Sequence, residues 1–266
     1  ATSGYNIAIG HSAGTAVTTG IQNTLIGGLA GDALVDADSN VAVGYAALSS
    51  DTLGSGSVAI GTQALTSQNF TSAVDVYNVA VGYRAGLAVT SGSKNTLIGG
   101  LAGDALTTGI VNVAVGYQAL SSDTAGKRSV AIGNGALFTQ NFTSATDTYN
   151  TAVGEAAGND ITTGTNNTLI GGLAGDALTT GSDNTVLGKS ALSAGVASFY
   201  NTAIGHNALA ADTTGRLSVA VGRNALAAQN NTSSANMYNT AVGSSAGAAV
   251  TTGTNNTLIG GLAGDA

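Results

Sequence analysis

The sequence predicts an all-β protein, a parallel β-solenoid of about fifteen coils with about 17–21 residues each. A five-residue motif recurs along the chain: Asn or Ser, a β-branched residue, Ala or Leu with Val186 as the one exception, then Ile, Val or Leu, then Gly. Its copies are evenly spaced, as Gly10 and Gly27 are, except in three longer intervals such as that from Gly61 to Gly82. β-branched residues at every second position are typical of a strand, and the glycine permits a turn. No helical period is present.

Each coil is numbered here from its Asn or Ser as position 1, which places the glycine of the motif at position 5. Four coil types, called a, b, c and d, alternate in a superrepeat that extends, for example, from Gly27 to Gly99, and only the d coil is longer than the others. The order is a-b-c-d twice, then a-b, one extra coil at 184–200, c-d and a-b. We therefore expect one continuous repeat domain over residues 1–266 that is a segment of a longer fibre. The fifteen glycines at position 5 are Gly10, Gly27, Gly44, Gly61, Gly82, Gly99, Gly116, Gly133, Gly154, Gly171, Gly188, Gly205, Gly222, Gly243 and Gly260.

The two faces of each strand have different residues. Alternation places positions 2 and 4 on one face and position 3 on the other. We expect the Val, Ile and Thr side chains of positions 2 and 4 to face the interior, opposite the alanine found at position 8 of every coil. Position 3 would then form an outward apolar stripe, which marks an interface between chains. The predicted interface residues are Ala8, Leu25, Ala42, Ala59, Ala80, Leu97, Ala114, Ala131, Ala152, Leu169, Ala203, Ala220, Ala241 and Leu258.

Positions 9 and 12 show an exchange of volume. In a and b coils position 9 is Gly and the apolar residue is at position 12, as in Gly31 and Leu34. In c, d and extra coils position 9 is Leu and position 12 is polar or Gly, as in Leu48 and Asp51. Because close packing penalises both voids and overfilling, this exchange indicates a shared core. Asn at position 1 of twelve coils predicts a hydrogen-bonded ladder along the stack.

Composition excludes several classes of function. Charged residues are only 8% of the chain, with a net charge of −7 and seven Lys and Arg, which argues against nucleic acid as a partner. The absence of Cys excludes disulfides and thiolate metal sites. No apolar run is long enough to span a membrane. We expect no cofactor and no enzyme, since no nucleophile and base stand out; carboxylates paired across coils, as in a glycosidase, are the alternative.

Acidic residues of the b and c coils are candidate metal ligands. The b-coil segment Gly-Gly-Leu-Ala-Gly-Asp resembles calcium-binding nonapeptide repeats, which makes Asp32, Asp104 and Asp176 candidates. A turn role is favoured, because calcium needs six or more oxygens and successive copies are separated by a whole superrepeat. A second group lies at position 12 of the c coils, where solvated turns are again favoured. Its members are Asp51, Asp123 and Asp212.

Two further sets of residues are candidate surface sites. Position 6, directly after the glycine, varies most among the coils. Its residues Tyr45, Tyr83 and Tyr117 are a possible display surface for stacking on a sugar or on another protein, or they shield the turn. Each d coil also contains an Asn-x-Ser/Thr sequon, a possible glycosylation site. The asparagines of these sequons are Asn69, Asn141, Asn230 and Asn231.

The segments 57–61, 129–133 and 218–222, with the sequence Ser-Val-Ala-Ile/Val-Gly, resemble the head repeat of YadA-like trimeric autotransporter adhesins. The same segments also resemble repeats of phage tail fibres. The resemblance covers essentially the whole chain, through this one short motif. It implies a left-handed parallel β-roll with three chains around an axis and small residues such as Ala59 facing that axis. The coils of this chain are longer than those of the family, and the matched motif is scaffold, so no ligand-binding residue is carried over.

Three functions remain open. The first is a structural rod of an extracellular or virion fibre, built by self-association of identical chains into a homotrimer or a polymer. The second is an adhesin or receptor-binding head at a cell surface that recognises glycans or matrix. The third is an ice-binding solenoid, suggested by Thr pairs such as Thr18-Thr19 and Thr107-Thr108. Adjacent threonines do not place two hydroxyls on one flat face, which disfavours this third function.

Overall fold

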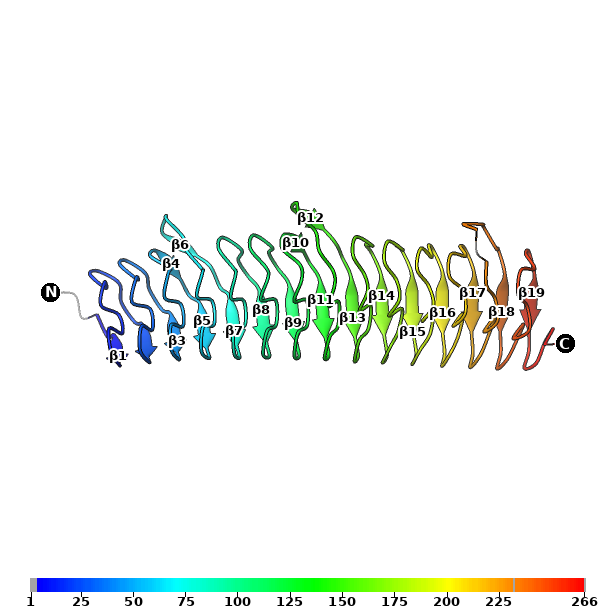
Figure 1. The fold of residues 1–266 in the computed structure, drawn as a ribbon, viewed down its shortest axis with the longest axis horizontal. Coiled ribbons are helices and arrows are strands. Elements are labelled where there is room, and N and C mark those ends of the chain that lie inside the picture. The colour runs from blue at the N-terminus through cyan, green and yellow to red at the C-terminus, as the bar shows by residue number, and fades with distance from the viewer. Residues whose placement is uncertain (1–3, 232, 266) are drawn as a thin grey trace. The chain divides into compact units, whose positions relative to one another are not determined.

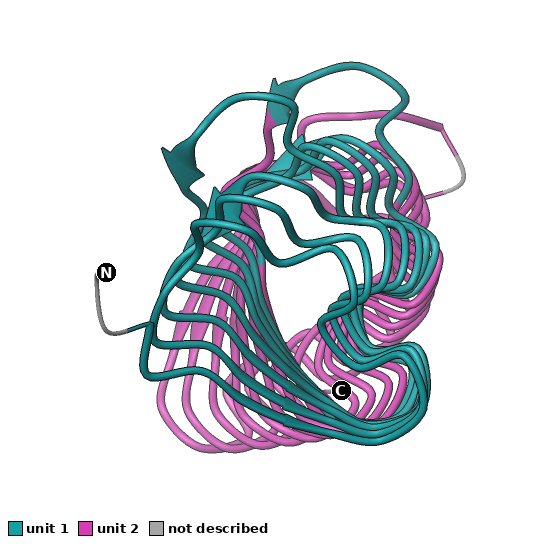
Figure 2. Ribbon diagram, turned by 90° about the vertical axis from the view of Figure 1, so that its left-hand side faces the viewer, with its two compact units in different colours: residues 1–129, 141–146 teal, residues 130–140, 147–266 magenta. Residues whose placement is uncertain are grey.

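The computed structural model describes residues 4–231 and 233–265 and confirms the predicted fold class. Short coils stack in parallel, each with one three-residue strand, and the described residues contain no helix (Figure 1). The chain forms two compact units, residues 1–129 with 141–146 and residues 130–140 with 147–266. Within each unit the coils follow a common outline, beyond which a few longer loops project (Figure 2). The handedness of the coils and the number of associated chains stay predictions.

In unit 1 seven strands pair side by side in the order β1-β2-β3-β5-β7-β8-β9, all parallel. A two-residue strand, β4, pairs with β6 on the long loop of the first d coil. The strands of this unit are β1 (Ile7–Ile9), β2 (Thr24–Ile26), β3 (Val41–Val43), β4 (Gly54–Ser55), β5 (Val58–Ile60), β6 (Val74–Asp75), β7 (Val79–Val81), β8 (Thr96–Ile98), β9 (Val113–Val115) and β10 (Gly126–Lys127). A further short strand, β12, is Thr146–Asp147.

In unit 2 eight strands pair in the same way, in the order β11-β13-β14-β15-β16-β17-β18-β19. The extra coil contributes β15, which pairs with both neighbours in the register of all other coils. One whole coil is therefore accommodated without a change in strand pairing. The strands are β11 (Val130–Ile132), β13 (Thr151–Val153), β14 (Thr168–Ile170), β15 (Thr185–Leu187), β16 (Thr202–Ile204), β17 (Val219–Val221), β18 (Thr240–Val242) and β19 (Thr257–Ile259).

Position 3 faces the core, so the predicted outward stripe is wrong. Most of its residues are at most 1% exposed within a single chain, while positions 2 and 4 lie at the surface. The exceptions lie in the first and last coils, where Ala8 is exposed and Leu258 is half-buried. The buried members of the predicted interface are Leu25, Ala42, Ala59, Ala80, Leu97, Ala114, Ala131, Ala152, Leu169, Ala203, Ala220 and Ala241.

The physical reason is the limited space inside the coil. A Cβ atom added to Gly31 would lie 2.8 Å from both Leu25 Cδ2 and Leu34 Cδ1. A Cβ atom on Gly14, in the preceding coil, would lie 2.7 Å from Leu25 Cδ1. The position-3 leucine of a b coil thus fills the space that two glycines leave, whereas coils with Leu at position 9 have room only for Ala or Val at position 3. The exchange between positions 9 and 12 is confirmed, with Leu34 and Leu48 both buried, and position 3 takes part in it.

The asparagine ladder is confirmed, and it bonds chiefly to backbone. Asn40 donates its Nδ2 hydrogen to the carbonyl of Gly54, 2.9 Å away and on the same coil. Its Oδ1 accepts the backbone N–H of Ser57 in the next coil at 2.8 Å. Its own N–H is donated to Oδ1 of Asn23 in the previous coil at 2.9 Å. Each of these buried asparagines therefore closes its own coil and joins it to its neighbours, whereas the d coils have Ser at position 1. Few buried side-chain polar atoms of the described residues lack a hydrogen-bond partner.

The glycine at position 5 permits the close approach of successive coils. A Cβ atom on Gly44 would lie 2.5 Å from the carbonyl oxygen of Gly61, the equivalent residue of the next coil. Gly44 also has φ +136, which side chains rarely adopt. The motif glycine is therefore required both by backbone conformation and by stacking.

Replacing Leu169 by Ala tests the inward direction of position 3. Leu169 is fully buried, so we expect Leu169→Ala to lower the free energy of unfolding by about 2–5 kcal/mol. Leu173 lies on the same coil and is 39% exposed, so the matched control Leu173→Ala should cost about 0.5 kcal/mol. Denaturant unfolding of both variants measures the difference. Equal costs for the two variants would contradict the inward direction of position 3.

Candidate interaction surfaces

One regular surface is the outward side of the parallel strands, made of positions 2 and 4 and called the sheet face. None of its residues is charged. Many of its side chains are more than one-third exposed, including Ile98 (38%) and Ile170 (37%). In unit 1 it consists of Ile7, Ile9, Thr24, Ile26, Val41, Val43, Val58, Ile60, Val79, Val81, Thr96, Ile98, Val113 and Val115. In unit 2 it consists of Val130, Ile132, Thr151, Val153, Thr168, Ile170, Thr185, Leu187, Thr202, Ile204, Val219, Val221, Thr240, Val242, Thr257 and Ile259.

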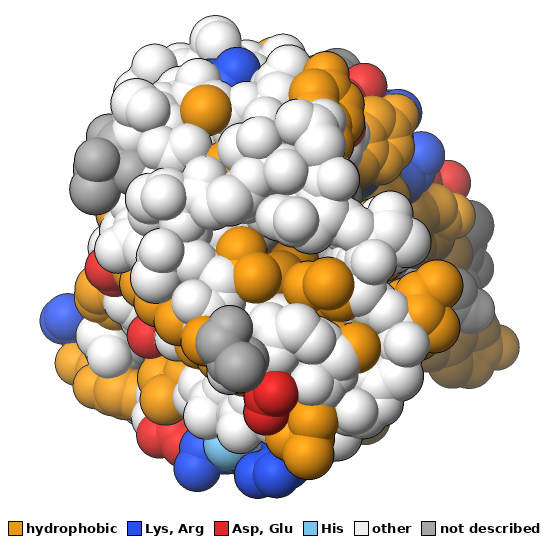
Figure 3. Space-filling model, turned by 90° about the vertical axis from the view of Figure 1, so that its right-hand side faces the viewer, with side chains coloured by type: hydrophobic (Ala, Val, Ile, Leu, Met, Phe, Trp, Pro, Cys, Tyr) orange, Lys and Arg blue, Asp and Glu red, His pale blue; other side chains and the backbone are white. Residues whose placement is uncertain are grey.

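Sequence reasoning assigned the sheet face to the core, because β-branched residues favour strands whichever way they point. The space-filling view onto the end shown at the right of Figure 1 has hydrophobic side chains at the surface among neutral polar atoms, with several charged side chains along the lower margin (Figure 3). The threonine pairs considered for ice binding lie elsewhere on the coil. The first threonine of several pairs donates its hydroxyl hydrogen to a carbonyl of the next coil, as Thr107 does to Thr124 at 2.9 Å. These hydroxyls hold the stack together.

The tyrosines form two lines along the coils. All eight are more than half exposed. Tyr45, Tyr83 and Tyr117 occupy position 6, at the edge where the strands end, with exposures of 56%, 52% and 55%. The other five directly precede position 1, at the edge where the strands begin, and sequence reasoning missed them. They are Tyr5, Tyr77, Tyr149, Tyr200 and Tyr238.

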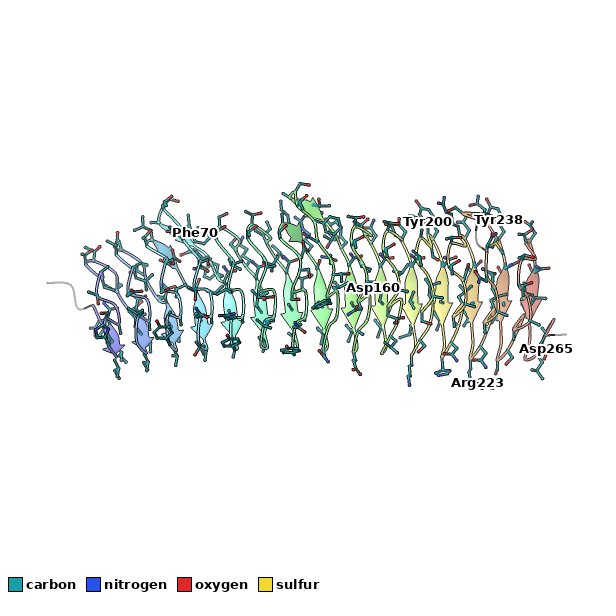
Figure 4. All side chains as sticks on the ribbon, in the orientation of Figure 1. Phe70, Asp160, Tyr200, Arg223, Tyr238 and Asp265 are labelled. Atoms are coloured by element: carbon teal, nitrogen blue, oxygen red, sulfur yellow. The ribbon has the colours of Figure 1, made fainter. Side chains whose placement is uncertain are left out.

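In unit 2 the two edges can be followed directly in Figure 4. Tyr200 and Tyr238 lie at the edge where the strands begin, and Arg223, at position 6 of its coil, lies at the opposite edge. The recurring dipeptide Tyr-Asn at the start of five coils is the signal that would have identified the second line. The sheet face of each unit is therefore bordered by exposed aromatic or polar side chains.

The c-coil aspartates are buried, which corrects the expectation that they are solvated. In unit 1, Oδ1 of Asp51 accepts the backbone N–H groups of Gly54 at 3.2 Å and Phe70 at 2.9 Å. Its Oδ2 accepts a hydrogen from Nε2 of Gln68 at 2.6 Å. Oε1 of Gln68 in turn accepts a hydrogen from Nδ2 of Asn78 at 2.9 Å. The carboxylate is thus bound by protein donors of two coils, which replaces the metal role considered for it.

The same arrangement recurs in unit 2 around Asp212. Its Oδ2 accepts a hydrogen from Nε2 of Gln229 at 2.7 Å, and its Oδ1 accepts the N–H of Gly215 at 2.9 Å. Burial raises the pKa of the Asp212 carboxyl, and these hydrogen bonds act in the opposite direction. Asp123, the third member of the group, is also fully buried. Asp at position 12 of one coil followed by Gln at position 12 of the next coil is the sequence signal for this pair of hydrogen-bonded side chains.

The b-coil aspartates do not come together. The Oδ1 atoms of Asp32, Asp104 and Asp176 are buried and accept no hydrogen bond from the described residues. Burial raises the pKa of the Asp104 and Asp176 carboxyls. The backbone carbonyl of Asp32 accepts the N–H of Ala16 from the preceding coil at 3.1 Å. Within the described ranges no three His, Asp or Glu residues gather in a way that would hold a metal ion. Asp160 of the preceding coil lies close enough to Asp176 for its negative charge to raise the pKa of that carboxyl further.

One pocket of about 310 Å³ in unit 1 is lined by Asp36, Asp38 and Asp75 beside β4 and β6. Each of the three carboxylates accepts a hydrogen bond from a donor of the protein. Asp36 accepts the hydroxyl hydrogen of Thr19 at 2.6 Å, Asp38 accepts the N–H of Ile21 at 2.8 Å, and Asp75 accepts the hydroxyl hydrogen of Tyr77 at 3.0 Å. The first two bonds join the coils of β1 and β2, and the third lies within the long d coil.

The sequon asparagines differ in their accessibility. Asn69 and Asn141 are exposed, and each accepts a hydroxyl hydrogen from a threonine of the preceding coil. Asn230 and Asn231 are half-buried, and Nδ2 of Asn231 lies 3.1 Å from the sulfur of Met237. Thr232, which belongs to both sequons there, lies outside the described residues. Glycosylation stays a prediction, and Asn69 and Asn141 present the more accessible amides.

Comparison with protein-family profiles, curated proteins and solved structures gives no significant match. The resemblance to YadA-like head repeats therefore stays a prediction that depends on the motif alone. Among the described residues, no helix has the length and apolar character needed to cross a bilayer.

The buried Asp212 carboxyl predicts an unusual pH dependence. Its pKa is raised in the folded state, so between the unfolded and folded pKa values the native state binds more protons, and stability from this group is lost as pH rises. Asp212→Asn removes this titration. We expect the free energy of unfolding of the wild type, minus that of the variant, to fall as pH rises from about 4 to about 7.

Denaturant unfolding at several pH values measures this difference. Asp183→Asn, at an exposed position of unit 2, is the control for loss of one charge. The absolute stability of Asp212→Asn will also change, because Gln229 loses its acceptor, so only the dependence on pH is diagnostic. A difference that increases with pH would show that the assigned direction of the pKa shift is incorrect.

Proposed function

We propose that this chain is a non-enzymatic structural element that self-associates through its sheet face to build an extracellular fibre or virion appendage. The observation that supports the proposal is the face itself. It combines β-branched and leucine side chains at regular spacing, without a single charge, over every three-residue strand of both units. Contiguous exposed apolar surface on a water-soluble chain marks a contact site, because its burial is favourable by about 25 cal/mol per Å².

A second copy of this chain is the partner that the face fits best. Identical chains present the same two lines of side chains at the same spacing, so their ridges and grooves can interdigitate. Charged side chains lie outside the face, so like charges do not oppose one another within the contact. Three copies are the number that the resemblance to trimeric adhesins implies. The contact residues in such an assembly are those of positions 2 and 4.

Recognition of a glycan or a surface receptor is the second candidate function. It is favoured by the exposure of all eight tyrosines at the two edges of the sheet face. Tyrosine presents a large flat ring and a hydroxyl group, which suits contact with sugars and with other proteins. Self-association and recognition are compatible, because the tyrosines at position 6 lie beyond the ends of the strands.

Sedimentation of a variant with charges on the sheet face tests self-association. We expect the wild type to sediment as a defined oligomer or polymer. In Ile98→Lys/Ile170→Lys, like charges face each other across the contact, so this variant should sediment as a monomer. The matched control Thr108→Lys/Thr180→Lys adds the same charges to exposed positions of the same two coils, outside the sheet face, and should assemble as the wild type does. A monomeric wild type would refute the proposal.

A further inference from the structure

The tyrosines at position 6 of unit 1 are evenly spaced. They belong to the coils of β3, β7 and β9, and Thr62 and Gly100 occupy position 6 of the coils between them. Backbone hydrogen bonds show that this line is stacked coil on coil, with the carbonyl of Tyr45 accepting the N–H of Gln63 at 2.9 Å. Successive tyrosines are thus two coils apart, a distance of about 9.5 Å at the usual spacing of β-strands.

Two of the rings share one orientation. A Cβ atom on Gly28 would lie 3.5 Å from Cδ2 of Tyr45, and a Cβ atom on Gly100 would lie 3.5 Å from Cδ2 of Tyr117. Each ring therefore leans over the glycine of the preceding coil and meets it with the same edge. The absence of a side chain on these glycines lets the rings lie close to the coil surface, where they form two matching platforms.

Polar groups lie between these platforms. Arg84 donates its Nε hydrogen to Oε1 of Gln63 at 2.9 Å, so the two side chains bridge neighbouring coils. The guanidinium carbon of Arg84 also lies 5.0 Å from the centroid of the Tyr83 ring, within the range of a cation–π contact. The middle tyrosine is thus accompanied by a guanidinium and an amide, the kind of groups that hydrogen-bond sugar hydroxyls.

We propose that this edge of unit 1 binds a linear β-1,4-linked hexose polysaccharide that runs along the stack of coils. In such a chain each sugar is turned over relative to the one before it, so every second ring presents the same face. The advance per two sugars is close to two coil spacings, which matches the interval between the tyrosines. Alternate sugars stack on Tyr45, Tyr83 and Tyr117, and Gln63 and Arg84 hydrogen-bond the hydroxyls beside them.

The proposed site is confined to unit 1. Position 6 of unit 2 contains no tyrosine and includes Glu155, Lys189 and Arg223, so it offers no aromatic platform. This inference goes beyond the structural role and does not depend on self-association. It specifies the proposed glycan recognition further, by placing it at the position-6 edge of unit 1 and by naming a β-1,4-linked chain as the ligand.

Calorimetric titration of the full chain with cellohexaose and with chitohexaose tests the site. We expect Tyr45→Ala and Tyr117→Ala each to weaken binding of the bound hexaose about tenfold, which corresponds to about 1.4 kcal/mol. Tyr77→Ala is the matched control, because Tyr77 is 55% exposed in the same unit but lies at the opposite edge of the sheet face. It should bind as the wild type does. Maltohexaose, whose α-linkages curve the chain, should bind at least tenfold more weakly.

Binding of neither β-linked hexaose would overturn the proposal, as would equal losses for Tyr77→Ala and Tyr45→Ala. Far-UV circular dichroism and thermal unfolding of each variant establish that it is folded. Titration of Ile98→Lys/Ile170→Lys separates the two functions. If this variant binds the hexaose with wild-type affinity, the polysaccharide site is independent of assembly. If the wild type is monomeric but binds, only the structural role fails.

Discussion

The buried asparagine at position 1 is the constraint on which the rest of the coil depends. A short coil that turns back on itself leaves backbone donors and acceptors inside a narrow cross-section, where water cannot reach them. One amide side chain satisfies both kinds of group. In Asn40 the nitrogen binds the carbonyl of Gly54 and so closes the coil, and the oxygen binds the N–H of Ser57 and so fixes the next coil above it. Coil closure and coil stacking are thus set by the same residue, which explains why Asn recurs in the a, b, c and extra coils although their apolar residues differ; the d coils have Ser at this position.

Volume is the second constraint, and the superrepeat follows from it. A core of fixed cross-section has room for a limited set of side chains, so Leu25 can enter only because Gly14 and Gly31 leave space. Where position 9 is leucine in the c and d coils, position 12 is Asp or Gln and needs hydrogen-bond partners in a neighbouring coil. Asp51 finds Gln68, and Asp212 finds Gln229. The order of coil types therefore follows from contacts between neighbouring coils. The b coil that follows an a coil fills the core space left by the glycine of the a coil, and the d coil that follows a c coil supplies hydrogen-bond donors to its buried aspartate.

The sequence alone predicted the period, the strands, the inward alanine of position 8 and the exchange between positions 9 and 12, because all of these depend on spacing and volume. It did not predict which strand face is inside. The alternation of side chains along a strand is the same whichever face is buried. Which face turns inward depends on the space between the strand and the opposite side of the coil, and the residues of one strand do not specify that space. Sequence reasoning also placed the c-coil aspartates in solvent, because two of the three donors to Asp51, Gln68 and Phe70, lie on the next coil. Leu48 adopts φ +53, like the glycine that replaces it in other coils. Glycine occurs at position 9 of the a and b coils because a side chain there would clash with the core. Its presence therefore did not indicate that position 9 has a positive φ in every coil.

The extra coil at 184–200 has a consequence for the alignment of neighbouring chains. A strictly periodic chain placed beside its own copy would match again after a slip of four coils, because the long loops of the d coils would coincide once more. The inserted coil keeps the strand register of β14 and β16 yet displaces every later coil type by one step. After a slip of four coils, the second d coil of one chain would now lie beside a c coil of its copy, so a long loop would meet a short coil. In an assembly of identical chains, this single insertion therefore disfavours the four-coil slip that an uninterrupted superrepeat would permit.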